Sequence, residues 1–512
     1  MAIRGESVQV GPWTGGVNYA VPAEALGPSE LFSMENMRVG IGGEVSKRGG
    51  IALYNSSAIS SNPTVTGVVE HRFSASSSKG YVIAGTKIFE DNLSASFTAR
   101  TSTMTISAGD DNTFAFANFR GDLYATNGVA SDTLLRVTAA GNNAQAADVD
   151  SRFTTAKAIE VFDNRLWWGN LSSGVDRVWR SDLADATVYG ANAFFQVGED
   201  VTALKKIGNA LSIHTKDSIH LAIPTGNAAL PYRLVQRANA GAVGERAIAN
   251  VQIPGSGEVV IYVRDDGVYQ FNGDSAQKIS WKLDGQRYWD DLNKTRLHKA
   301  FVVKYPKKNE LWIWVPNGAS QTPMNQAIVY DYVRQIWYGP FTGVTRNCGA
   351  LVNREPHFGG HSSGRVFTHE SSTLSDLSGT ATSGIDAFME TASSTPMGTD
   401  VMLRWLYLRT SFDVLGNYDV LVTYTGPGIV GESSTLSMLG GFDAIETAFE
   451  IQASSISADA SLASSDTDLG GYDPSLKVRY ANSSATEDMK IRRARAVYKP
   501  LGRVRKASAG IN

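Results

Sequence analysis

A short pattern of a turn residue, an apolar residue and, in most copies, an aromatic residue recurs along the middle of the chain. Its apolar members stand at positions 123, 166, 211, 268, 311 and 366, so that successive copies are separated by 43, 45, 57, 43 and 55 residues. A seventh copy lies at 87–89. A period of roughly 40–50 residues is typical of one four-stranded blade of a β-propeller. We interpret the longer intervals as loop insertions between strands.

Short strands are predicted along almost the whole chain. Compact apolar runs bounded by Gly, Asn, Asp and Ser recur, for example at 80–85 and 258–263. Helical periodicity is scarce and is limited to a short window at 284–293. The chain is therefore predicted to be all-β, a β-propeller with a C-terminal β-sandwich-like domain. The alternative is a large β-protein in which the longer period arises by chance.

The length of 512 residues exceeds what one hydrophobic core supports, so two or three domains are expected. Hydrophobic residues make up 42% of the chain and charged residues only 19%, a composition that supports packed cores and excludes a disordered chain. We predict an N-terminal hairpin or arm joining the propeller at 1–60, the propeller at 61–370, an acidic sandwich-like domain at 371–489 and a basic closing strand and tail at 490–512.

Charge divides the C-terminal part sharply. Residues 371–489 contain 16 Asp and Glu but only 4 Lys and Arg, whereas residues 490–512 contain eight Lys and Arg and no acid. The basic segment is expected to lie along the acidic domain of its own subunit or of the next one, in preference to DNA phosphates. Its candidate partner-contacting residues are Arg492, Arg493, Arg495, Arg503 and Arg505.

The only cysteine, Cys348, excludes an internal disulfide, and no Cys and His spacing resembles a zinc site. The first residues lack the apolar core of a signal peptide, and no apolar run is long enough for a membrane span. Assembly in a cytoplasm is the expectation, and neither a cofactor nor a metal is predicted.

Three groups of residues raise catalytic or metal-binding hypotheses. The histidines His357, His361 and His369 lie among glycines and serines, and turn histidines are the preferred interpretation. Residues 466–473 alternate oxygen ligands as a calcium loop does, but the glutamate at the twelfth position is missing. The acidic pairs at 110–111, 265–266 and 290–291 are interpreted as turn residues at strand ends, because adjacent side chains of a strand point to opposite faces. The sequence therefore does not predict an enzyme.

An ordered set of residues opens the chain and carries a resemblance. These residues are Gly15, Gly16, Asn18, Asn36, Arg38, Lys47, Arg48 and Gly49. The pattern resembles the start of virion proteins of short-tailed bacteriophages, with Gly49 where that pattern often has proline. Weaker similarities to the same group of proteins follow at 164–170, 177–182, 328–338 and 498–503. Together these segments resemble tail nozzle subunits, which are similar to tail tubular protein B, over most of the chain.

The resemblance implies a structural virion protein that forms a ring, commonly of six copies, in the distal part of a short tail. It implies attachment below the portal and adaptor, contacts with other tail proteins such as fibres or spikes, and viral DNA that passes through the lumen without sequence-specific binding. From the residues alone, the two glycines permit tight turns and the two asparagines can bond backbone groups. For any one of these residues taken alone, an ordinary hairpin turn is the preferred explanation.

Two alternatives remain open. A propeller of a phage tail could bind or cleave glycans, because propellers carry many functions and aromatic side chains stack on sugars. The aromatic candidates, which are more often core residues, are Trp167, Trp168, Trp312, Trp314 and Trp337. A cellular adhesin or scaffold propeller would be expected to carry an export signal.

Overall fold

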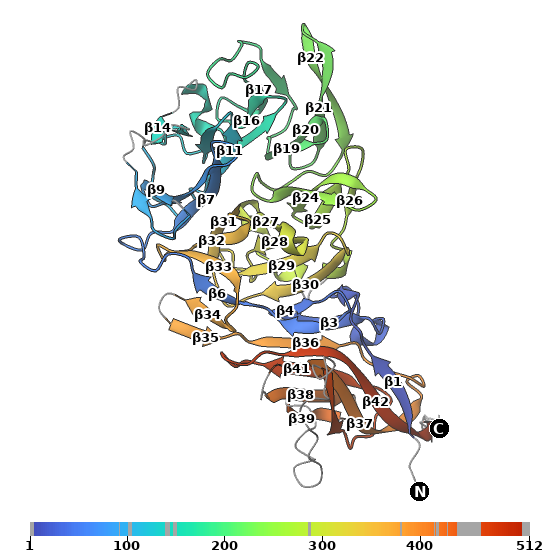
Figure 1. Cartoon of the computed structure of the whole chain (residues 1–512). Coiled ribbons are helices and arrows are strands. Elements are labelled where there is room, and N and C mark those ends of the chain that lie inside the picture. Colours follow the sequence, from blue (N-terminus) through green and yellow to red (C-terminus); the bar gives the residue numbers. More distant parts are fainter. Residues whose placement is uncertain are drawn as a thin grey trace. The chain divides into compact units, whose positions relative to one another are not determined.

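β-Strands make up nearly all of the regular structure (Figure 1). The computed structural model assigns the chain to two compact units, residues 51–335 with 343–369 and residues 1–50 with 336–342 and 370–512. We call them the propeller unit and the sandwich unit. None of the described helices is long and apolar enough to cross a membrane. The structure describes all residues except 1–4, 92, 101–104, 139–143, 147–150, 285–287, 379–380, 414, 416–418, 427–428, 438–461 and 504–512.

The propeller unit holds seven antiparallel sheets within its described residues. The first two consist of β7 (Val65–Arg72), β8 (Ser78–Ala84), β9 (Lys87–Asp91) and β10 (Thr98–Ala99), and of β11 (Ala115–Phe119), β12 (Asp122–Thr126), β13 (Leu135–Val137) and β14 (Ala144–Ala146). The third and fourth consist of β15 (Ala158–Phe162), β16 (Arg165–Leu171), β17 (Gly174–Arg180) and β18 (Phe194–Gln196), and of β19 (Ala203–Ile207), β20 (Ala210–His214), β21 (Ile219–Asn227) and β22 (Leu230–Ala238).

The remaining three sheets complete the series. The fifth consists of β23 (Ile248–Ile253), β24 (Gly257–Arg264), β25 (Gly267–Phe271) and β26 (Ala276–Lys278). Within this unit the sixth holds β27 (Phe301–Tyr305), β28 (Glu310–Val315) and β29 (Gln326–Asp331). The seventh holds β31 (Arg346–Val352), β32 (Glu355–Gly360), β33 (Val366–Ser371) and β6 (Gly50–Leu53).

The seven sheets close into a ring. The first strand of each sheet contacts the first strand of the next, and β31 of the seventh sheet contacts β7 of the first. The seventh sheet is completed by β6, which precedes the first sheet in the sequence, so that both ends of the unit meet in one sheet. A ring of this kind leaves few sheet edges unprotected. The prediction of an all-β propeller is confirmed.

The sequence repeat marks hairpin turns rather than one fixed position of each blade. Leu123, Leu166, Leu211 and Leu311 lie in second strands, whereas Val268 and Val366 lie in third strands. The long intervals of 57 and 55 residues arise where one copy lies in the second strand of a blade and the next copy lies in the third strand of the following blade. Our interpretation of them as loop insertions was therefore wrong, because both hairpins of a blade need the same turn chemistry.

Short 3₁₀ helices account for the described helical residues. In the propeller unit they are η2 (Ser151–Thr155), η3 (Trp281–Leu283), η4 (Trp289–Asp291), η5 (Lys294–Lys299) and η6 (Pro306–Lys308). The helical window expected at 284–293 contains only η4 among its described residues. The sandwich unit contributes η1 (Ala23–Ala25).

The sandwich unit is built from two six-stranded sheets. One has the order β4 (Met37–Val39), β5 (Val45–Lys47), β42 (Lys490–Arg503), β37 (Val401–Asp413) and β40 (Leu462–Asp468), with β1 (Glu6–Val10) on β42. The other has the order β2 (Gly16–Val17), β3 (Glu30–Glu35), β36 (Ala387–Thr391), β41 (Lys477–Asn482), β38 (Asp419–Gly426) and β39 (Ile429–Ser437). This unit also contains β30 (Ile336–Phe341) and the hairpin of β34 (Ser375–Ser378) and β35 (Ala381–Gly384).

Side chains of the two sandwich sheets meet in a buried core. Trp405 and Leu408 of β37 and Val478 and Tyr480 of β41 are fully buried. The hydroxyls of Thr410 and Tyr480 lie 2.9 Å apart and bond the two sheets. The first fifty residues, for which we expected an arm joining the propeller, cluster with this unit and supply β1 to β5.

Candidate functional site

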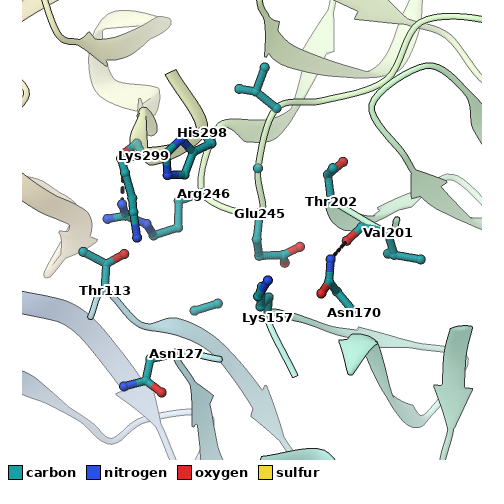
Figure 2. Close-up of a pocket in the computed structure, with 13 residues that line it drawn as sticks. Thr113, Asn127, Lys157, Asn170, Val201, Thr202, Glu245, Arg246, His298 and Lys299 are labelled. Atoms are coloured by element: carbon teal, nitrogen blue, oxygen red, sulfur yellow. Dashed lines mark hydrogen bonds between the residues drawn. The ribbon is translucent and has the colours of Figure 1, made fainter. Parts of the chain in front are cut away.

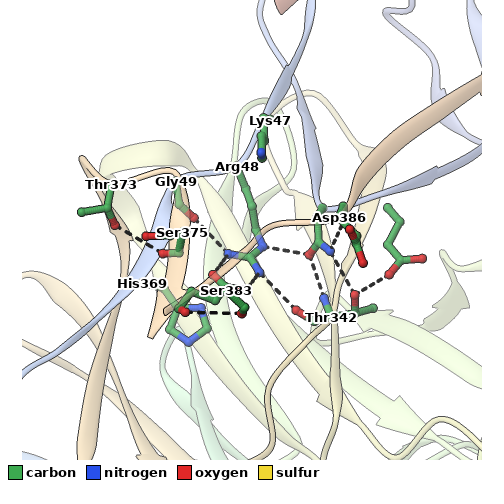
Figure 3. Close-up of polar contacts among 12 residues, drawn as sticks. Lys47, Arg48, Gly49, Thr342, His369, Thr373, Ser375, Ser383 and Asp386 are labelled. Atoms are coloured by element: carbon green, nitrogen blue, oxygen red, sulfur yellow. Dashed lines mark hydrogen bonds and ion pairs between the residues drawn. The ribbon is translucent and has the colours of Figure 1, made fainter. Parts of the chain in front are cut away.

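Arg48, from the opening pattern of the chain, lies at the centre of a buried polar network of the sandwich unit (Figure 3). Its side chain is 1% exposed and forms two bonds with the carboxylate of Asp376, of 2.8 Å and 2.5 Å. The same guanidinium donates to the carbonyl oxygens of Gly49 and Thr342, at 3.0 Å and 3.1 Å. A bidentate pair of this kind fixes both side chains in one geometry.

Asn36 connects this network to two further segments. Its backbone has a φ of +53°, and its side-chain oxygen accepts hydrogen bonds from Arg48 Nε at 2.8 Å and from the backbone N–H of Thr342 at 2.9 Å. Its side-chain nitrogen donates to the carbonyl oxygen of Asp386 at 2.8 Å. Asparagine suits this position because it tolerates positive φ and offers both a donor and an acceptor.

Two more basic residues of the opening pattern are buried in the same unit. Arg38 forms a 3.0 Å ion pair with Glu370, and its guanidinium lies 5.1 Å from the ring centroid of Phe341. The ammonium of Lys47 donates to the side chain of Asn482 and to two backbone carbonyls, at 2.7–3.2 Å. These cations hold the fold together and are not available to a ligand.

The glycines of the pattern serve close approaches of the backbone. Gly16 has a φ of +69°, and a Cβ there would lie 2.3 Å from the carbonyl oxygen of Trp337. A Cβ at Gly49 would lie 2.8 Å from the carbonyl oxygen of Ser371, and one at Gly15 would lie 3.0 Å from that of Ser29. Gly15 is therefore needed because a side chain would not fit at this position, and not because the backbone has a positive φ. Asn18 accepts from the N–H of Ala20 through its side chain, as expected of a turn.

The basic segment forms strand β42 and engages acids of its own unit. Arg492 binds both carboxylate oxygens of Asp413, and Lys490 lies 2.6 Å from the same carboxylate. Burial alone would raise the pKa of Asp413, but these two cations lower it. Arg493 and Arg495 are exposed as well and line a pocket of about 410 Å³ with Arg409. The side chain of Arg503 and all of Arg505 lie outside the described residues.

The propeller unit contains an open cavity of about 440 Å³ that is lined by residues of the first strands of all seven sheets. We call it the axial cavity. Glu160 on β15 and Lys205 on β19 form a 2.9 Å ion pair in its wall. Glu245, which precedes β23, accepts a 2.8 Å hydrogen bond from the backbone N–H of Leu204. Burial raises the pKa of Glu245 well above its ordinary value, while the two glutamates outweigh burial and raise the pKa of Lys205.

Figure 2 shows a second pocket. It adjoins the axial cavity and shares Ala115, Glu245 and Arg246 with it. We call it the loop pocket. Its volume is about 240 Å³, and most of its lining comes from the segments that lead into the first strands of five sheets. The polar residues that line it are Thr113, Asn127, Lys157, Asn170, Thr202, Glu245, Arg246, His298 and Lys299. None of them was proposed from the sequence as a site residue, although Asn170 ends the segment 164–170 of the resemblance.

Cys348 lies in the wall of the axial cavity and is 4% exposed. Its Sγ donates to the carbonyl oxygen of Val65 at 3.3 Å, and burial raises its pKa to about 12. At pH 8 this makes the thiolate about a thousandfold scarcer than in an ordinary thiol. We therefore expect a thiol reagent such as dithionitrobenzoate to label Cys348 only after urea unfolds the propeller unit. Rapid stoichiometric labelling of the native protein would contradict this prediction.

The catalytic and metal-binding candidates from the sequence are engaged in local contacts. His357 bonds the backbone of Glu355, and His369 packs edge-on against Phe358 with a centroid distance of 4.5 Å. Asp111 binds Arg296 through both carboxylate oxygens. Further contacts join His361 to Asp110, Asp265 and Asp266 to Arg264, Asp290 to Lys294, Asp466 to Arg409, and Asp473 to Ser475. Among the described residues, no three His, Cys, Asp or Glu side chains gather as a metal site.

The five tryptophans considered as sugar platforms are at most 1% exposed. Trp167 donates its indole N–H to the carbonyl oxygen of Phe162, and Trp168 donates to the hydroxyl of Tyr189 at 2.7 Å. In the sixth sheet, Trp312 donates to the Glu310 carboxylate, and Trp314 packs on Phe301. These rings are core residues, as the alternation within their strands indicated.

Comparisons with known proteins identify no family. No protein-family model matches the chain, and no curated protein matches it. Among solved structures, the WD40 domain of Pan2 from Neurospora crassa is 9% identical, with a TM-score of 0.37 over 64% of this chain and 95% of that one. BamB from Moraxella catarrhalis is 11% identical, with a TM-score of 0.36 over 66% and 96%. An exo-β-1,3-galactanase from Phanerochaete chrysosporium is 11% identical, with a TM-score of 0.29 over 78% and 98%. Similarities this loose support no functional argument.

Proposed function

We propose that this chain is a structural subunit of a ring in the tail of a short-tailed bacteriophage, of the tail nozzle type. The observation that carries the proposal is the opening pattern of residues in its order along the chain. Its described side chains are buried within one unit, where Arg48, Asn36 and Arg38 bind segments more than 300 residues away. Buried long-range contacts of this kind make the fold rigid, and a rigid fold is expected of a structural subunit.

In this proposal, six copies surround a channel through which the genome leaves the virion. The ring attaches below the portal and adaptor and carries other tail proteins, such as fibres or spikes, on its outer surface. The subunit is made in the host cytoplasm and resides in the virion tail. It acts without catalysis or a cofactor, and DNA passes without sequence-specific contacts.

Electron microscopy of the purified protein tests this proposal. We expect negative-stain images to show rings with a central hole, because homo-oligomers of virions close by cyclic symmetry. Light scattering should then give a mass of about 330 kDa, six times the 55.0 kDa of the chain. If assembly needs the adaptor, the ring should form when the adaptor is added. A protein that remains monomeric both alone and with purified adaptor would contradict the proposal.

A glycan-cleaving propeller is the second candidate, and one observation favours it. Glu160 and Glu245 both line the axial cavity, and burial raises the pKa of Glu245, as in a general acid. We prefer the ring because Glu160 is held by Lys205, and Glu245 by a backbone N–H. Incubation with host surface polysaccharide distinguishes the two: we expect no release of reducing ends. Release that disappears in Glu245→Gln would establish the enzyme instead.

A further inference from the structure

Three cations meet at the loop pocket of the propeller unit. Lys157 leads into β15, Arg246 into β23 and Lys299 into β27, so each comes from a different blade (Figure 2). The segments that carry them are packed closely, since a Cβ at Gly244 would lie 2.7 Å from the carbonyl oxygen of His298. The stem of Lys157 lies against Gly128, where a Cβ would be 2.6 Å from its Cγ. The cations are thus held in place by the fold.

Arg246 is fixed in position without being neutralised. Its two terminal nitrogens donate to the carbonyl oxygens of Asn347 and Lys299, each at 2.9 Å, and its guanidinium lies 5.8 Å from the ring centroid of Phe301. A guanidinium has five N–H donors, so three are left after these two bonds. Burial lowers the pKa of Arg246 to about 10, which still leaves it charged at neutral pH.

The two lysines also retain free donors. Lys299 uses one of its three N–H groups, on the carbonyl oxygen of Asp111 at 2.7 Å. Burial, and then the charges of Arg246, Arg296 and Lys157, lower the pKa of Lys299, although Asp111 opposes this. The ammonium of Lys157 forms no hydrogen bond or ion pair with the described residues of the chain. The three cations therefore repel one another when the pocket holds no anion.

The nearby carboxylates do not balance these charges. Asp111 directs both carboxylate oxygens to Arg296. Glu245, the one acidic residue among the described residues that line the loop pocket, accepts a hydrogen bond from the N–H of Leu204 and interacts with Lys205 in the axial cavity. His298 bonds the carbonyl oxygen of Thr295 through Nδ1, and burial lowers its pKa, so it is neutral near pH 7. A net positive charge remains at the pocket.

We propose that the loop pocket binds a phosphate group, either free or carried as a monoester on a small polyol or sugar. Lys157, Lys299 and Arg246 all line the pocket and carry N–H donors, which suit the oxygens of a phosphate monoester. The volume of about 240 Å³ accommodates the phosphate with a substituent of a few atoms, and is small for a drug-sized ligand. This proposal does not depend on the proposed ring.

Calorimetric titration of the full chain tests the site, with inorganic phosphate and glycerol 1-phosphate as the two probes. We expect saturable binding of at least one probe at one site per chain. Lys157→Gln and Lys299→Gln should each weaken it roughly tenfold, since each removes one charge-assisted contact. The matched control is Lys87→Gln, an exposed lysine of β9 outside the pocket, which should bind as the parent protein does. Tighter binding of glycerol 1-phosphate would assign the site to a phosphorylated small polyol or sugar, and tighter binding of inorganic phosphate to the free ion.

Two results would overturn the proposal. One is the absence of saturable binding of both probes up to millimolar concentrations by a folded protein. The other is binding that both pocket variants retain, or that Lys87→Gln weakens equally, because either would indicate general attraction to surface charge. Circular dichroism of each variant ensures that a loss of binding is not a loss of fold. Arg246 is left unchanged because its bonds to two backbone carbonyls also support the fold.

Discussion

Replacement of Arg48 by alanine is expected to lower the free energy of unfolding of the sandwich unit by about 3–5 kcal/mol. The substitution would leave the Asp376 carboxylate, whose side chain is 6% exposed, buried without its cation. It would also remove one of the two hydrogen-bond donors to the Asn36 side-chain oxygen, and the side-chain donor to the Thr342 carbonyl oxygen. Urea unfolding of the purified protein, followed by circular dichroism, measures the loss.

An exposed pair of the same geometry is the control for Arg48. Arg409 and Asp466 also form two bonds, each of 2.7 Å, but their side chains are 51% and 43% exposed. Arg409→Ala should cost less than about 1 kcal/mol, because water replaces the lost contacts. The double substitution of Arg48→Met with Asp376→Leu should recover much of the loss, because neither charge is then left buried. Equal effects of Arg48→Ala and Arg409→Ala would show that burial of the first pair is unimportant.

Trp168→Ala is expected to destabilise the propeller unit by about 3–5 kcal/mol. Trp168 is fully buried, stacks on Phe153 with a centroid distance of 5.6 Å and donates its indole N–H to Tyr189. The substitution therefore creates a cavity and leaves the Tyr189 hydroxyl without this bond. Thermal unfolding by circular dichroism should show a lower transition temperature for the propeller unit.

Trp281→Ala provides the comparison in the same unit. Trp281 is 53% exposed, so its loss should change the free energy of unfolding by less than about 0.5 kcal/mol. The contrast separates tryptophans that build the core from one that is accessible to a ligand. If Trp168→Ala unfolds as the parent protein does but loses binding to a glycan, the interpretation of the blade tryptophans as core residues would be wrong.

The blade period was visible in the sequence because turn chemistry is local. Each hairpin needs residues such as Asn, Asp or Gly at its turn, and the strand that follows has a buried apolar residue at its first or second position. This local signal cannot distinguish the second strand of a blade from the third. Val268 and Val366 therefore entered the repeat beside Leu123 and Leu166, and the number of blades was not predicted.

The opening pattern was found, but its partners were not. Arg48 and Asn36 stand out in the first fifty residues, whereas Thr342, Asp376 and Asp386 have no feature that marks them in the sequence. Contacts between residues that lie about 300 positions apart depend on which strands share a sheet. Neither composition nor the spacing of motifs indicates which strands pair. The loop pocket was missed for the same reason, because Lys157, Arg246 and Lys299 are isolated charges in three separate loops.

The sequence by itself determined the class of fold and where its hairpins turn, because alternation, turn residues and apolar runs act within a few neighbouring residues. It also indicated the closing strand β42, although the alternation expected at 493–498 matches exposed and buried side chains only from 493 to 496, because residues 497 and 498 are both buried. Only the tertiary structure decided how many blades close the ring, which charges are buried in pairs and which converge on a pocket. Those outcomes depend on the free energy of packing between segments that are far apart in the sequence. This packing occurs only once the sheets have formed.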